Sequence, residues 1–136
     1  MKRSPIYYQN RKRLLKLEST GIKYRPTSES ATEWFHILNE QIFGNKLKLV
    51  EDIKIVRHYG THAFYNYSRK CEPDYPKSSM SFYTVFKDEK LFVEILAHEM
   101  VHHFQYSFDE PLGHGPSFWA WRDNFRLKGL TLHKVA

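Results

Sequence analysis

Two histidines with a glutamate between them, in the segment His98-Glu99-Met100-Val101-His102, form the part of the sequence best suited to do chemistry. On a helix, residues four apart lie about 40° apart around the axis and about 6 Å along it, so both imidazoles can face one ion. Zinc is the ion that such nitrogen donors favour. Glu99 lies about 100° around the helix from His98. Its long side chain can reach a water beside the metal, which is the position of a general base.

A third ligand is expected, because a catalytic zinc usually keeps three protein ligands and one open position. His114 is the preferred candidate, since Gly113 and Gly115 beside it let the chain turn sharply and bring its imidazole back over the helix. His103 points about 100° away from His102 and is expected to be a packed or exposed neighbour. The remaining histidines suit structural positions near a strand turn, a helix or the chain end: His36, His58, His62 and His133.

The helices that must position these residues follow from capping and helix-breaking residues. Asp88 predicts the cap of a helix from about Glu89 to Ser107, which contains the pair of histidines. An earlier helix is predicted to begin with a capping box at Ser30-Ala31-Thr32-Glu33 and to end at Gly44-Asn45. A helix beginning at Ser4-Pro5, a linker over residues 19–28 and a last helix over Ser117–Leu127 complete the expected elements.

Three segments with strand character lie between these helices. Alternating apolar residues predict a strand over Asp52–Arg57, and aromatic and β-branched residues predict strands over Ala63–Tyr67 and Ser79–Phe86. The prolines in residues 70–77 indicate a loop between the last two. Together with the helices, this order indicates an α+β domain. Aromatic residues at helical spacing are expected in its core: Trp34, Phe35, Phe92, Phe104, Phe118 and Trp119.

Length and composition limit the class of protein. The 136 residues suffice for one domain with a sizeable core, and 41% hydrophobic and 16% aromatic residues argue against a disordered chain. The single cysteine, Cys71, excludes a disulfide framework and a cysteine-built zinc finger. The longest nearly apolar stretch, Leu91–Val101, is too short and too polar to span a membrane, and no signal peptide is predicted. We expect an intracellular, cytoplasmic protein.

The positive charge is concentrated at the N-terminus. Residues 1–25 hold eight basic residues against one acid, a net charge of +7, whereas the formal net charge of the whole chain is +6. Such an arm suits a polyanion such as DNA, with contacts predicted through Arg11, Lys12, Arg13 and Lys16. The alternative is a solvated tail that keeps the protein soluble.

The motif His98-Glu99-x-x-His102, followed by His114-Gly-Pro-x-Phe-Trp, resembles the SprT-like metallopeptidase family, which includes the Spartan type. The segment Phe35-x-x-x-Asn39-x-x-x-Phe43-Gly44-x-x-Leu47 is also similar to that family, so the resemblance covers residues 30–128. It implies a small zincin-like metalloprotease domain at residues 30–136, with a short, mostly antiparallel sheet packed on the active-site helix. The basic N-terminal arm and linker would occupy residues 1–29.

The resemblance also implies a site and an activity. His98, His102 and His114 would hold Zn²⁺, and Glu99 would be the catalytic acid and base. Spartan-like members cleave proteins crosslinked to DNA, a repair activity that DNA binding switches on. Many members carry a cysteine-rich zinc ribbon, which a chain with one cysteine cannot form. DNA contact would therefore fall to the N-terminal arm.

The expected reaction is hydrolysis of a peptide bond in a DNA-bound protein. Glu99 would activate the zinc water for attack on the carbonyl and deliver the proton to the leaving amine. The substrate is expected to lie extended along a sheet edge. The oxyanion needs a further donor, and the sequence does not choose among four tyrosines: Tyr65, Tyr67, Tyr83 and Tyr106.

Two other functions stay open at the level of the sequence. One is a nucleic-acid-binding protein with a closed structural zinc site, in which His103 or Cys71 would be the fourth ligand. The other is a metallohydrolase for a small peptide or amide, in which the basic arm would be incidental. A monomer is expected in each case.

Overall fold

The structure is a computed structural model that describes residues 3–57 and 60–134. Five helices occur in these ranges: α1 (Pro5–Leu15), α2 (Ser28–Gln41), α3 (Glu89–Ser107), α4 (Pro116–Trp119) and α5 (Arg122–Leu127). The strands are β1 (Asp52–Ile55), β2 (Ala63–Tyr67) and β3 (Ser78–Phe82). None of the helices in this part of the chain is long and apolar enough to cross a lipid bilayer.

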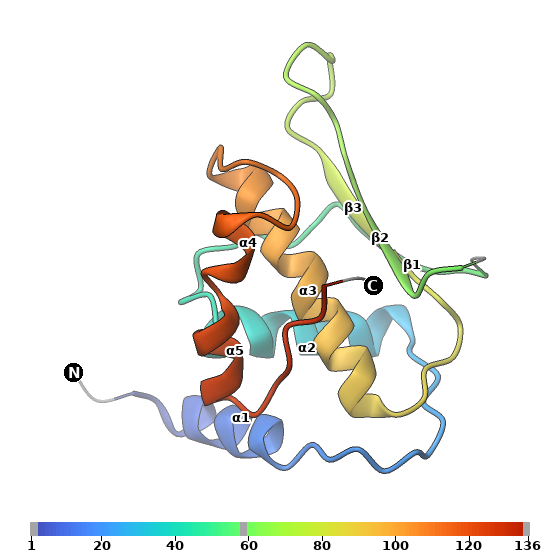
Figure 1. Cartoon of the computed structure of the whole chain (residues 1–136), viewed down its shortest axis with the longest axis vertical. Helices are drawn as coiled ribbons and strands as arrows, with labels where there is room; N and C mark the ends of the chain where they lie inside the picture. The colour runs from blue at the N-terminus through green and yellow to red at the C-terminus, as the bar shows by residue number, and fades with distance from the viewer. Residues whose placement is uncertain (1–2, 58–59, 135–136) are drawn as a thin grey trace.

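Helix α3 lies between the sheet on one side and the α4–α5 segment on the other (Figure 1). Helix α2 contacts both α3 and β1, and α1 packs against α2 at the end of the molecule opposite the β2–β3 hairpin (Figure 1). The predicted α+β domain is therefore confirmed. Because α3 is covered on several sides, even its polar residues Glu94, His98 and Glu99 are buried. Burying such groups costs free energy, so their presence on α3 indicates a role other than packing.

The sheet has the strand order β1-β3-β2. Strands β2 and β3 pair antiparallel, with Ala63 opposite Phe82 and Tyr67 opposite Ser78, whereas β1 and β3 pair parallel. The expectation of a mostly antiparallel sheet thus holds for one of the two pairings. Strand β2 is an edge strand of this sheet and contacts α3. Strand β2 therefore lies beside the helix that carries the predicted site.

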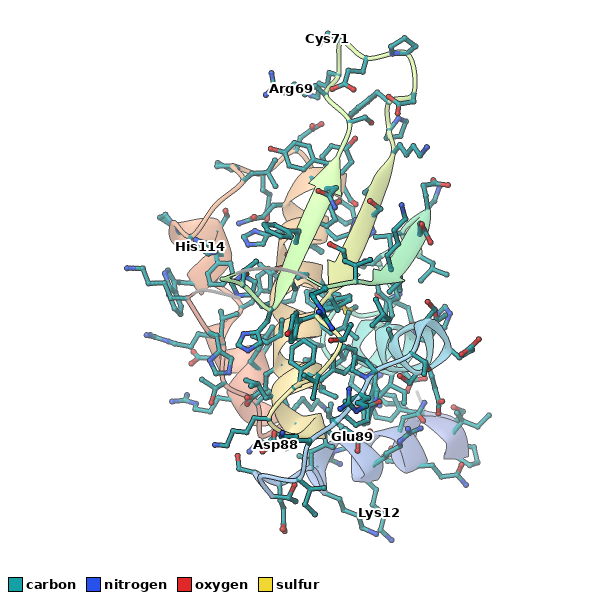
Figure 2. The ribbon with its side chains drawn as sticks, turned by 90° about the vertical axis from the view of Figure 1, so that its right-hand side faces the viewer. Lys12, Arg69, Cys71, Asp88, Glu89 and His114 are labelled. Atoms are coloured by element: carbon teal, nitrogen blue, oxygen red, sulfur yellow. The ribbon has the colours of Figure 1, made fainter. Side chains whose placement is uncertain are left out.

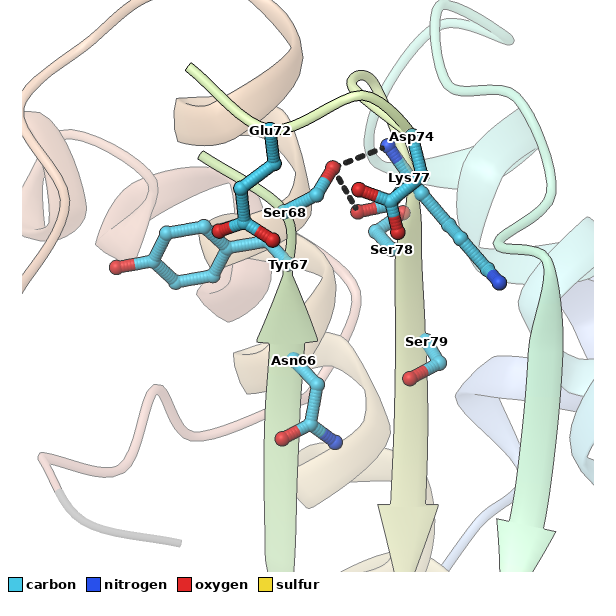
Figure 3. A pocket seen from close by; sticks show the side chains of 8 residues that line it. All are labelled: Asn66, Tyr67, Ser68, Glu72, Asp74, Lys77, Ser78 and Ser79. Atoms are coloured by element: carbon cyan, nitrogen blue, oxygen red, sulfur yellow. Dashed lines mark hydrogen bonds between the residues drawn. The ribbon is translucent and has the colours of Figure 1, made fainter. Parts of the chain in front are cut away.

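The β2–β3 hairpin extends beyond the helices, and Ser68 closes the start of the loop that joins the two strands (Figures 1 and 3). The backbone N–H of Lys77 donates to Ser68 Oγ at 2.9 Å, and the Ser68 N–H donates to the Lys77 carbonyl at 2.8 Å. Tyr106 of α3 donates its hydroxyl to the Ser68 carbonyl at 2.7 Å. A polar hollow of about 200 Å³ lies on this hairpin (Figure 3). The bond from Tyr106 ties the start of this loop to α3.

The predicted start of α3 is confirmed, but the predicted start of α2 is wrong. Asp88 Oδ1 accepts the Leu91 N–H at 2.9 Å, as a cap before Glu89 requires. Helix α2 begins at Ser28, with Thr27 as its N-cap. Ser30 and Thr27 exchange reciprocal bonds of 3.0 and 2.9 Å, so Ser30, which was predicted as the cap, instead closes a capping box that begins at Thr27. Glu33 instead pairs with Arg13 of α1.

The segment predicted as a linker is attached to the domain. Tyr24 and Phe86 exchange backbone hydrogen bonds of 2.9 and 2.8 Å in an isolated bridge, and the Gly21 N–H donates to Asp88. The strand predicted over Ser79–Phe86 accordingly ends at Phe82 and continues only as this bridge. The first strand is also shorter than predicted and ends at Ile55.

The last predicted helix is two short helices in the structure, α4 and α5. The Trp121 N–H donates to the Phe118 carbonyl, three residues back, and the regular four-residue pattern is interrupted there. Trp121 packs against Phe43 and Phe104, with ring centroids 4.7 and 4.8 Å away. Four of the six predicted core aromatics are buried, and Phe104 and Trp119 are partly buried against the same core.

Candidate metal centre

Three histidines from two parts of the chain converge on one point. His98 and His102 project from consecutive turns of α3, and His114 comes from the loop between α3 and α4. One nitrogen of each ring lies within 4.8 Å of the other two. The structure therefore brings together the three residues predicted as ligands. Figure 2 shows His114 on the loop that passes along α3.

Hydrogen bonds on the far side of two of these rings fix which nitrogen carries the hydrogen. His98 Nδ1 donates to the His133 carbonyl at 2.6 Å, because a carbonyl can only accept. His102 Nδ1 donates to the Gln105 side-chain oxygen at 2.9 Å. In neutral imidazoles, both Nε2 atoms then carry lone pairs, and they lie 3.3 Å apart. Neither has a hydrogen to share, so this contact suits a cation between them.

The donor set fits zinc. Three imidazole nitrogens, two of them on rings whose second nitrogen is hydrogen-bonded, are the arrangement that zinc favours in sites with an open position. The cluster can hold a metal ion, and its chemistry is consistent with Zn²⁺.

Phe118 of α4 forms the floor under the three histidines. Its side chain is fully buried, and its ring centroid lies 5.0, 5.4 and 4.7 Å from those of His98, His102 and His114. The ring limits how far each imidazole can rotate. Phe118 was predicted as a core residue, and its place under the site is a feature that the sequence analysis missed.

Glu99 lies beside the cluster with only 3% of its surface exposed. Burial raises the pKa of its carboxyl from 4.5 to about 8, because the charged form loses its hydration. Such a carboxyl is a stronger base than an ordinary glutamate. The position and burial of Glu99 suit a group that takes up and releases a proton.

The pKa values of two of the histidines are shifted in the opposite direction, downward. Burial lowers the pKa of His98 to about 4, with a smaller effect from His102 in the same direction. Burial also lowers the pKa of His102, against the opposing hydrogen bond from Gln105. Both rings are therefore neutral near pH 7, which is the form that binds a metal.

The cluster opens on a cleft of about 550 Å³. One wall is the β2 strand with the residues before it, and the other is formed by α3 and residues 112–114. Glu99 is the single carboxyl among the described side chains lining this cleft, and no lysine or arginine is among them. The exposed apolar side chains of Phe64 and Leu112 lie on opposite walls. The cleft is therefore suited to an extended chain with apolar side chains.

The remaining histidines are placed elsewhere among the described residues. His103 is buried, and both of its nitrogens are engaged, one with the Tyr65 hydroxyl at 2.8 Å and one with the Lys48 carbonyl at 2.7 Å. His36 is exposed on α2, and His62 stacks on Phe86. His133 contributes its carbonyl to His98 and its ring to Glu94. His58 lies outside the described residues.

The structure reduces the number of tyrosines that are candidates for stabilising an oxyanion. Tyr65 and Tyr67 line the cleft, whereas Tyr83 does not, and Tyr106 donates its hydroxyl to the Ser68 carbonyl. The Lys48 carbonyl requires a hydrogen on His103 Nε2, so Nδ1 of the neutral ring accepts the Tyr65 hydroxyl hydrogen. Tyr65 is thus held in place with its hydrogen directed away from the cleft.

Two polar residues that hold the ligands were missed by the sequence analysis. Gln105 bonds to His102, and Glu94 bonds to the segment that reaches His98. Both are buried on α3. Their spacing offered a signal, since Gln105 lies three residues after one ligand and Glu94 four residues before the other, on the same side of the helix.

This combination of fold and site is that of a metallopeptidase-type domain. The comparison with known families agrees, because residues 31–133 match the SprT-like family, and the chain belongs to it. Members of this family are in general zinc metallopeptidase-type domains. No curated protein matches the chain.

Proposed function

We propose that the protein is a zinc-dependent endopeptidase that cleaves DNA-associated or DNA-crosslinked proteins. The observation that carries this proposal is the convergence of His98, His102 and His114 beside the buried Glu99, at the bottom of an open cleft. Among the described residues, the cluster has three members and no fourth. Three ligands with one open position favour a catalytic site over a closed structural one.

The roles of the chain's own residues follow from their positions. Bound Zn²⁺ would polarise the scissile carbonyl and acidify the attacking water. Glu99, buried beside the cluster, would accept the proton of that water and return it to the leaving amine. The three imidazoles would hold the ion; those of His98 and His102 are fixed by hydrogen bonds at their second nitrogens, and Phe118 packs against all three.

The edge strand β2 is the proposed docking site for the substrate. It lines the cleft and, among the described residues, is an edge strand of the sheet next to β3. An extended peptide can pair with such an edge through its backbone, which gives affinity with little selection among side chains. This would suit an enzyme that acts on many unfolded or crosslinked proteins.

DNA contact is proposed for the exposed face of α1. Arg11, Lys12 and Lys16 are exposed there. Arg13 is already engaged, since its guanidinium pairs with Glu33 and lies 4.5 Å from the ring centroid of Trp34. We therefore assign Arg13 to the α1–α2 interface and the other three to DNA.

The alternative of a structural zinc in a nucleic-acid-binding protein needs a fourth ligand. Neither candidate for that position belongs to the cluster. Both nitrogens of His103 are bonded elsewhere, and Cys71 is exposed at the tip of the hairpin, away from His114 (Figure 2). These placements favour the catalytic function over the structural one.

The proposal is tested by incubating zinc-loaded protein with a DNA-binding protein, with and without DNA. Glu99→Gln serves as the matched variant, since it keeps the side-chain volume and removes the base. Zinc content is measured in both proteins before the assay. We expect cleavage by the wild type, stimulation by DNA, and a loss of about 10²–10⁴-fold in the variant with zinc retained.

The outcomes separate the three functions. Cleavage without any effect of DNA would support a peptidase and contradict the DNA-linked substrate. Cleavage of short peptides alone would favour the small-peptide hydrolase. No cleavage by the zinc-loaded wild type would contradict the peptidase and favour a structural zinc.

A further inference from the structure

Gln105 makes contacts that join the two parts of the metal centre. It is fully buried on α3, one turn after His102. Its side-chain oxygen accepts from His102 Nδ1 at 2.9 Å and from the Gly113 N–H at 3.3 Å. Its side-chain nitrogen donates to the Gly113 carbonyl at 3.1 Å and to Ser117 Oγ at 3.0 Å. Both hydrogens and both acceptor positions of the amide are therefore used.

The backbone of Gly113 fixes the orientation of this amide. The Gly113 N–H can only donate and its carbonyl can only accept, so the amide cannot be turned over without losing both bonds. The oxygen of Gln105 must then face His102. Because that oxygen only accepts, His102 carries its hydrogen on Nδ1 and keeps the Nε2 lone pair for the metal centre.

The same amide holds the loop that carries the third ligand. Gly113 directly precedes His114 and has a φ of +131°, a conformation that glycine adopts readily and other residues rarely do. His114 itself is exposed. The Gln105 amide bonds to both the N–H and the carbonyl of Gly113. It also bonds to Ser117, whose hydroxyl donates to the Pro111 carbonyl at 2.9 Å. The loop is thus closed around one buried side chain.

We propose that Gln105 is the positioning residue that assembles the metal centre, by orienting His102 and by fixing the loop that presents His114. One buried amide would couple a ligand on a helix to a ligand on a loop, so that the three imidazoles are preorganised before the ion arrives. This inference rests on the proposed zinc site.

The test is zinc affinity, measured by competition with a chelator, for the wild type and Gln105→Met. Methionine has a similar length and a high helix propensity, but it can make none of the four hydrogen bonds. We expect zinc affinity to fall about 10–100-fold, which is the loss usually found when a residue that supports a ligand is removed.

Gln41→Met is the matched control. Gln41 is a buried glutamine of α2 that donates to the Tyr7 carbonyl at 2.9 Å, away from the cluster. It should lose stability without losing zinc affinity. Unchanged zinc affinity in a folded Gln105→Met would overturn the proposal, and so would an equal loss in both variants. The spectrum of the Co²⁺-substituted proteins should change in Gln105→Met alone, because it reports the ligand geometry.

A second measurement needs no variant and is independent of folding defects. Nitrogen-15 spectra of the zinc-loaded wild type should show His102 protonated at Nδ1 and bound through Nε2. Binding through Nδ1 would contradict the assigned role of Gln105. If the wild type binds no zinc at all, the proposed function fails first, and that result is distinguishable from a wild type that binds zinc with the other nitrogen.

Discussion

At the scale of the residue, folding and catalysis favour different protonation states of Glu99. A carboxyl that is 3% exposed is stable in the folded chain mainly when it is protonated, whereas a general base must be able to lose its proton. Its pKa is raised to about 8 in the metal-free chain. A cation in the neighbouring cluster would favour the carboxylate. The cost of burying Glu99 should therefore be measurable when zinc is removed.

We predict that the metal-free wild type loses stability relative to Glu99→Gln as the pH rises. Between the unfolded pKa of 4.5 and the folded pKa of about 8, the folded chain holds a proton that the unfolded chain has released, so raising the pH favours unfolding. Each unit of pKa difference corresponds to about 1.4 kcal/mol, which gives an effect on the order of a few kcal/mol. Urea unfolding at pH 5 and pH 9 measures it.

The comparison of these two proteins removes the contribution of the histidines. The pKa values of His98, His102 and His103 are lowered by burial, so these rings destabilise the folded chain as the pH falls below about 6.5. That effect is common to both proteins and cancels in the difference. Stability curves that run parallel across this range would show that Glu99 ionises normally in the folded chain.

The sequence predicted the three ligands but not the residues that hold them. His98 and His102 carry a local signal in their spacing, and His114 carries one in its flanking glycines. Phe118 reaches the site, and Gln105 makes its contacts to Gly113 and Ser117, only when the α3–α4 loop folds back over α3, although the spacing of Gln105 from His102 could have been noticed. Contacts between elements have no fixed spacing along the chain, so a single sequence gives them no distinct pattern.

At the scale of the element, the segment after α5 acts as a support for α3. Glu94 accepts the Thr131 N–H at 2.7 Å and bonds to the His133 ring at 2.9 Å. These two bonds place the His133 carbonyl against His98 Nδ1. Leu130 and Leu132 are buried beside them. A short segment without regular structure thereby fixes the ring of one ligand.

We predict that Glu94→Gln lowers zinc affinity about tenfold, because the substitution removes the negative charge that strengthens both bonds and leaves one oxygen, which can accept at only one of the two positions. Glu89→Gln is the control, since it makes the same change on the same helix, where Glu89 accepts the Trp34 indole N–H. Chelator competition measures both. Equal zinc affinities for the two variants would show that the segment does not act on His98.

The ends of helices and strands could be predicted from the sequence where a single side chain determines them. Asp88 caps α3 as predicted. The predicted start of α2 was wrong because the capping box is formed by Thr27 and Ser30 rather than by Ser30 and Glu33. A serine closes this box, where the usual pattern has a glutamate or glutamine. The break between α4 and α5 depends on how Trp121 packs against Phe43 and Phe104, which lie far away in the sequence. Tertiary packing of this kind overrides local helix propensity.

At the scale of the whole molecule, α1 and the β2–β3 hairpin lie at opposite ends, with the metal centre between them (Figures 1 and 2). Lys12 marks the α1 end and Cys71 the hairpin tip (Figure 2). DNA bound to α1 would leave the edge of β2 free for a protein substrate. Leu14 of α1 is 1% exposed, so deleting this helix would open the core as well as remove charge. Substitution of exposed charges is therefore the cleaner test.

We predict that reversing the charges of Arg11, Lys12 and Lys16 to glutamate weakens DNA binding and abolishes stimulation of cleavage by DNA, while zinc affinity and DNA-independent cleavage are kept. The log–log slope of DNA affinity against salt concentration should become shallower by about one for each phosphate that the variant no longer neutralises. The control reverses three exposed lysines on other surfaces, so that the net charge changes equally: Lys46, Lys54 and Lys87. If both triple variants lose DNA affinity to the same extent, the chain binds DNA through its overall charge rather than through α1. If neither loses it, DNA is bound elsewhere, and the basic N-terminal arm is a solvated segment whose charge does not direct the peptidase to its substrate.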